Sequence, residues 1–167
     1  MFNQNNGTMK KNNGFNIMLF VFIINLIFIL SCTGIIKNQS AGALLQTDRD
    51  FSAMSVREGM FKAFLFYIAE DGVILQDNTY PLKGRETLKK RFSGKSDTAF
   101  VLSWVPLYEK IAESGELGYT YGIHSSFNKT TGGITKGTYL TIWRKQTDGT
   151  WKFVLDTGTQ GLPDKSE

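Results

Sequence analysis

Apolar residues recur at helical spacing over residues 48–69, and this periodicity predicts one long amphipathic helix. Thr47 stands just before the stretch as a candidate N-cap. Gly84 precedes a second, shorter helix that we predict over residues 85–92. The apolar positions of the long helix are Phe51, Met54, Met60, Phe61, Phe64, Tyr67 and Ile68.

The pattern changes after Gly94, where apolar and β-branched segments alternate with turn residues. Asp148-Gly149 is typical of a two-residue hairpin turn. Helices followed by an antiparallel meander define an α+β fold. We therefore expect a strongly bent antiparallel sheet packed on the long N-terminal helix and the shorter one. The predicted strands cover residues 73–75, 100–108, 117–127, 134–145 and 151–157.

The predicted turns also fix which residues face each other across the sheet. The Asp148-Gly149 turn places Thr141 opposite Asp156, and a turn at residues 129–133 places Gly122 opposite Tyr139. Since side chains alternate along a strand, the two faces then differ in character. We expect the long helix to cover the more apolar face, formed by Leu117, Tyr119, Tyr121, Ile123, Leu140, Ile142, Trp151, Phe153 and Leu155.

The opposite face is too aromatic for an ordinary solvent-exposed surface. We expect it to form either a dimer interface or the wall of a cavity. Its members are Thr120, Gly122, His124, Tyr139, Thr141, Trp143, Val154 and Asp156.

A short apolar run, Ile17 to Leu30, precedes the only cysteine, Cys32. Its fourteen residues fall short of the ~20 that span a bilayer. A basic start, a short apolar stretch and a small-residue end are typical of a secretory signal. The tetrad that ends at Cys32 resembles the lipobox of bacterial lipoproteins, which implies lipidation of this cysteine. Met9 is an alternative initiator to Met1.

We therefore predict four segments: a lipoprotein signal peptide (1–31), a tether (32–46), a folded domain (47–158) and a polar tail (159–167). The expected location is the bacterial cell envelope, on the periplasmic or outer side, with a lipid anchor in the membrane. Removal of residues 1–31 leaves 17 Lys and Arg against 15 Asp and Glu. This small net charge predicts no nucleic-acid surface. One cysteine and one histidine predict no metal site, and we expect no cofactor.

Three runs in the second half resemble nuclear transport factor 2-like domains, closest to the SnoaL-like and ketosteroid-isomerase-like branch. They are residues 114–122, 136–143 and 148–156, and the resemblance extends over about residues 47–158. It implies a cone in which helices pack into a bent sheet around a pocket, and it implies frequent dimers. The fold serves isomerases, cyclases, dehydratases and non-enzymes, so the resemblance leaves the function open.

No catalytic constellation emerges from these residues. Asp71 and Asp77 flank the early strand, but neither matches the base that the isomerases place there. His124 and Asp156 are weak catalytic candidates, because the register separates them by about 10 Å across the sheet and about 13 Å along it. The candidates for lining a pocket are Tyr67, Trp104, Tyr139, Trp143 and Asp156.

Three hypotheses follow. The domain binds a small apolar or amphipathic molecule, or it forms a homodimer or another protein contact through its aromatic face. The alternative is a SnoaL-like isomerase, cyclase or dehydratase that carries out acid–base chemistry on a carbonyl compound through Asp156 or His124. We rank binding and dimerisation above catalysis.

Overall fold

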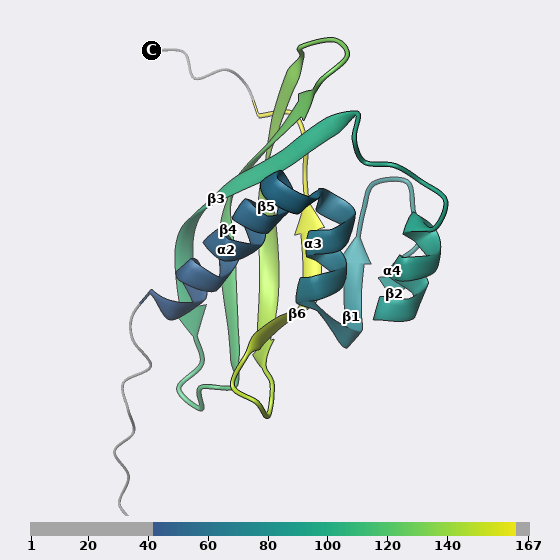
Figure 1. The fold of residues 1–167 in the computed structure, drawn as a ribbon. Coiled ribbons are helices and arrows are strands. Elements are labelled where there is room, and N and C mark those ends of the chain that lie inside the picture. Colours follow the sequence, from purple (N-terminus) through teal and green to yellow (C-terminus); the bar gives the residue numbers. More distant parts are fainter. Residues whose placement is uncertain (1–41, 163–167) are drawn as a thin grey trace, which may run out of the picture. The chain divides into compact units, whose positions relative to one another are not determined.

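A computed structural model describes residues 42–162, which form three helices and one six-stranded sheet. In chain order the elements are α2 (Ala43–Glu58), α3 (Met60–Tyr67), β1 (Ile68–Leu75), β2 (Leu82–Lys83), α4 (Arg85–Phe92), β3 (Phe100–Ile111), β4 (Leu117–Asn128), β5 (Ile134–Lys145) and β6 (Trp151–Gly158). The predicted α+β class is confirmed. Helices α2 and α3 lie across one face of a curved sheet, and α4 lies beside β1 and β2 (Figure 1). The predicted signal peptide, most of the tether and Cys32 lie outside the described residues.

The strand order is β2-β1-β6-β5-β4-β3, so the sheet is mixed. β3 to β6 form the predicted antiparallel meander, but β1 runs parallel to β6. This parallel pair departs from the all-antiparallel expectation. It joins segments about eighty residues apart, and no local turn signals such a contact.

The predicted long helix is two helices. Gly59 lies between them with φ of 93°, a conformation that L side chains rarely adopt. A Cβ at this position would lie 2.8 Å from Oδ2 of Asp97. The same carboxylate accepts a hydrogen bond from the Phe61 amide at 2.8 Å and so satisfies a free donor at the start of α3.

α2 begins at Ala43, before the predicted N-cap Thr47. Glu109, on β3, accepts hydrogen bonds from the amides of Gly42 and Leu45 at 2.5 and 2.6 Å. A carboxylate at this end of a helix also interacts favourably with the helix dipole. The cap therefore comes from a distant strand, whereas Thr47 lies inside the helix and donates its hydroxyl to the Ala43 carbonyl.

The predicted hairpin registers are confirmed: Thr141 pairs with Asp156, and Gly122 with Tyr139. Gly122 leaves room for the neighbouring ring, since a Cβ there would lie 2.9 Å from Cε1 of Tyr139. A bulge after Ile142 then alters the pairing, so that Trp143 faces Phe153 and not Val154.

The assignment of faces was wrong. The helices cover the face with Thr120, Thr141 and Trp143, which are all essentially inaccessible to solvent. Tyr119 and Tyr121, predicted to be core, are 37% and 45% exposed on the other face. Hydrophobicity alone misled the prediction, because the polar side chains of the covered face are hydrogen-bonded and can be buried at little cost. The bulge adds Phe153 to that covered face.

Candidate ligand-binding pocket

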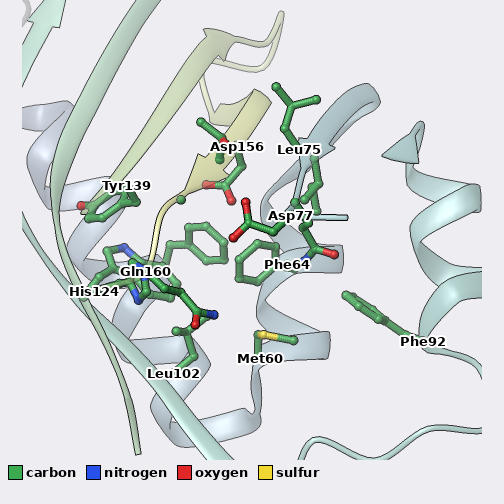
Figure 2. Close-up of a pocket in the computed structure, with 16 residues that line it drawn as sticks. Met60, Phe64, Leu75, Asp77, Phe92, Leu102, His124, Tyr139, Asp156 and Gln160 are labelled. Carbon is green, nitrogen blue, oxygen red and sulfur yellow. The ribbon is translucent and has the colours of Figure 1, made fainter. Parts of the chain in front are cut away.

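A pocket of about 360 Å³ lies between the helices and the covered face of the sheet. Its size is within the range usual for small-molecule sites. Apolar and aromatic side chains form most of its wall, and a few polar groups project into it (Figure 2). Figure 2 shows Asp77, His124, Tyr139 and Asp156 around one cavity. The aromatic members of the wall are Phe51, Phe64, Phe92, Trp104, His124 and Tyr139.

Asp48, on α2, organises the buried polar network behind this wall. Its side chain is inaccessible to solvent, and its two carboxylate oxygens accept hydrogen bonds from Trp104 Nε1 and Tyr139 Oη, both at 2.7 Å. Burial raises the pKa of Asp48, and these hydrogen bonds oppose that shift. The network thus fixes the two rings that face the pocket.

Sequence reasoning missed Asp48, although a signal was present. Buried residues of α2 recur at helical spacing, and Asp48 stands in the middle of that stripe between Leu44 and Phe51. Ser52, one turn later, accepts a hydrogen bond from the Trp104 amide and donates one to the Trp104 carbonyl, both at 2.8 Å. An acidic residue within an apolar stripe indicates a buried carboxylate with partners.

Asp156 projects into the pocket from β6. Thr141, its partner across the sheet, donates its hydroxyl to Asp156 Oδ2 at 2.7 Å. Desolvation raises the pKa of Asp156 to about 7, with a further upward contribution from Asp48 and an opposing one from the Thr141 hydrogen bond. Asp156 can therefore exchange a proton near neutral pH.

His124 lies in the same wall on β4. Its Nε2 donates a hydrogen bond to the Thr159 carbonyl at 2.9 Å, because a carbonyl oxygen can only accept. Its buried Nδ1 has no hydrogen-bond partner among residues 42–162. No hydrogen bond joins His124 to Asp156 in this part of the chain, so the structure shows two separate polar groups in one pocket and no dyad.

The other predicted pocket residues divide into two groups. Trp104 and Tyr139 line the pocket with Asp156. Tyr67 and Trp143 do not line it and pack in the aromatic core around Phe51. Trp143 is fully buried and donates its Nε1 hydrogen to Thr120 at 2.8 Å. Its large ring fills space between the helices and the sheet instead of lining this pocket.

The two acidic residues beside the early strand also have different environments. Asp71 pairs with Arg144 on the surface, and this pairing lowers the pKa of Asp71. Asp77 lines the pocket. Residues 42–162 contain no group of three metal-ligating side chains and no helix long and apolar enough to cross a bilayer.

Solved structures with the same architecture identify the fold. A protein from Novosphingobium aromaticivorans, described as nuclear transport factor 2-like with a cystatin-like fold, superposes with a TM-score of 0.59 at 13% identity, over 94% of each chain. This chain has the nuclear transport factor 2-like fold. At this level of identity the similarity establishes the fold alone. Neither a protein-family model nor a curated protein sequence matches the chain.

Two further solved structures that superpose on this chain carry enzyme names. A ketosteroid isomerase-like protein from Erwinia carotovora atroseptica has a TM-score of 0.57 at 15% identity, covering 75% of this chain and 99% of its own. A putative scytalone dehydratase from Novosphingobium aromaticivorans has the same TM-score at 19% identity, covering 72% and 83%. The fold therefore accompanies differently named proteins, and the function has to be argued from the pocket.

Proposed function

We propose that this domain binds a small, mainly apolar molecule between its helices and its sheet. The pocket supports the proposal, because it combines aromatic walls with a few polar groups that can orient a ligand. The Asp48 network holds two of those walls in place through Trp104 and Tyr139. A fixed pocket loses less entropy when a ligand binds than one that must first be ordered.

Binding is favoured over the SnoaL-like enzyme. A general acid or base must itself lie within hydrogen-bonding reach of the proton it transfers, and a second group often orients it. Asp156 bonds to Thr141 and His124 to Thr159, but no hydrogen bond links Asp156 to His124 in the described residues, so no acid–base pair is assembled there.

A pocket-filling substitution tests the proposal. Leu102 lines the pocket, so Leu102→Trp should fill part of it and weaken binding of a neutral hydrophobic dye such as Nile red by about tenfold. Val56→Trp is the matched control, because Val56 is 53% exposed and does not line the pocket. Fluorescence titration of both variants and the wild type measures the effect. Equal dye affinity in all three proteins would show that the dye does not use this pocket, and the proposal would fail.

We also infer that the exposed face of the sheet forms a homodimer. This face carries Tyr108, Tyr119 and Tyr121, each more than a third exposed, and Tyr108 stacks on Tyr121 with ring centroids 5.3 Å apart. Clustered aromatic side chains on a surface are typical of protein interfaces. The dimer was first expected on the opposite face, which α2 and α3 cover.

A lipid anchor at Cys32 is part of the same proposal. Its support is the sequence alone: a basic start, a short apolar run and a cysteine within small residues. The domain would then work at a membrane of the bacterial cell envelope.

A further inference from the structure

The charged side chains of the pocket lining are acidic. Asp77 and Asp156 contribute carboxyl groups, whereas the amides of Gln76 and Gln160 offer both donors and acceptors. No lysine or arginine belongs to the lining, although the whole chain carries a formal net charge of +4. The pocket therefore has a local negative character that the composition of the chain does not suggest.

The carboxyl groups of Asp77 and Asp156 lie in the same region of the pocket. β1 runs beside β6, so Ile74 pairs with Asp156 and Asp77 follows the end of β1. Figure 2 shows the Asp77 and Asp156 side chains turned into the same part of the pocket. Asp156 lies in the partly desolvated interior and Asp77 in the exposed loop after β1, so an ammonium held between them would be attracted by both carboxylates.

His124 supplies a second, independent indication. Because Nε2 carries the hydrogen that the Thr159 carbonyl accepts, Nδ1 of the neutral ring is an acceptor. This buried atom has no partner within residues 42–162. A buried acceptor without a partner is costly, and a donor that reached this atom would remove the cost.

Aromatic rings form another part of the pocket wall. Phe51, Phe64 and Trp104 line the pocket beside the acidic groups. Their faces attract cations, and their edges and faces also pack against apolar groups. A ligand with one cationic end and one apolar end would match both kinds of wall.

We propose that the pocket binds a protonated amine that carries an apolar, ring-sized group. The ammonium would donate hydrogen bonds to the carboxylates of Asp156 and Asp77, while the apolar group packs among the aromatic side chains. This inference rests on the proposed function, because it names the chemical class of the ligand for the same pocket.

The proposal predicts that binding is coupled to a proton. Burial raises the pKa of Asp156 to about 7, so this carboxyl group is largely neutral in the empty pocket at acidic pH. An ammonium favours the ionised form, and Asp156 would release its proton when the amine binds. The other titratable groups around it are Asp48 behind the wall and Tyr139, His124 and Asp77 in the lining.

Calorimetric titration of the full-length protein with three probes of similar shape tests this inference. Phenethylamine, phenethyl alcohol and hydrocinnamate differ mainly in the charge at one end. At about pH 8 we expect the amine to bind about tenfold more tightly than the alcohol, with the carboxylate weakest. At about pH 5.5 the affinity for the amine should fall about tenfold, while that for the alcohol should not fall.

Substitutions inside and outside the pocket test whether its two acids cause the preference for the amine over the alcohol. Asp77→Asn and Asp156→Asn should each reduce the preference for amine over alcohol. Glu86→Gln removes the same charge from α4, outside the pocket, and should leave the preference unchanged. Binding of the alcohol as tightly as the amine, or a preference that survives both pocket variants, would overturn the inference but leave the proposed function intact. Failure of all three probes to bind would contradict both.

Discussion

At the scale of single residues, the buried Asp48 and the half-buried Asp156 give the domain an unusual dependence on pH. Burial raises the pKa of Asp156 to about 7, whereas in the unfolded chain it is near its ordinary value of about 3.9. The folded state therefore binds the Asp156 proton more tightly than the unfolded chain does. The stability gained from this tighter binding is complete below about pH 4. It is lost as the pH rises toward about 7. The raised pKa of Asp48 acts in the same direction.

Asp156→Asn should make the domain more stable at alkaline pH. The amide cannot ionise, and its oxygen can still accept the Thr141 hydroxyl. We expect the free energy of unfolding to rise by roughly 1–4 kcal/mol at about pH 8. At about pH 4.5 the gain should be much smaller. Urea unfolding at both values measures the difference.

Asp148→Asn is the control for that experiment. Thr150 donates hydrogen bonds to Asp148, which lowers the pKa of Asp148, so the sign is reversed. Any stability lost in this variant should be lost at about pH 8 and regained on acidification. An Asp156→Asn variant that is equally destabilised at both pH values would show that the Asp156 side chain has only a structural role.

The sequence predicted part of the pocket but missed Asp48, which organises the hydrogen-bond network behind its wall. Trp104, Tyr139 and Asp156 emerged as pocket candidates from register and composition. Asp48 did not, because its role depends on contacts with β3 and β5 that no local spacing reveals. Helical spacing alone could have indicated that Asp48 is buried.

At the scale of elements, the turn residues predicted the strand pairing correctly. Asp148-Gly149 fixed the pairing of Thr141 with Asp156, because a two-residue turn permits few registers. The pairing of β1 with β6 and the bulge after Ile142 depend on long-range contacts and were not predictable in this way. The helix break could have been read from Gly59, which lies within the periodic stretch.

The exposed face of the sheet leads to a prediction about association. Tyr121→Arg would place a charge among the clustered tyrosines, and we expect it to weaken a homodimer at least about tenfold. Tyr80→Arg is the matched control, because Tyr80 is 94% exposed and lies in a loop away from this face. Analytical ultracentrifugation measures the equilibrium. A wild-type protein that stays monomeric at high concentration would contradict the dimer.

At the scale of the whole molecule, we propose that a lipid on Cys32 anchors the pocket domain to a membrane. Cys32→Ser should abolish incorporation of radioactive palmitate in a bacterial host and move the protein from the membrane to the soluble fraction. Lys37→Ser, in the predicted tether, should retain both the label and the membrane location. Unchanged labelling of Cys32→Ser would contradict the anchor and would leave the proposal about the pocket unaffected.

We propose above all that the space between the helices and the sheet is a ligand site. A crystal structure of the protein with bound phenethylamine would show whether this space is occupied. We predict density for the ring among Phe64 and Trp104, with the amine nitrogen within hydrogen-bonding distance of Asp156. A pocket closed by its own side chains, with the probe bound only on the exposed face of the sheet, would contradict the claim.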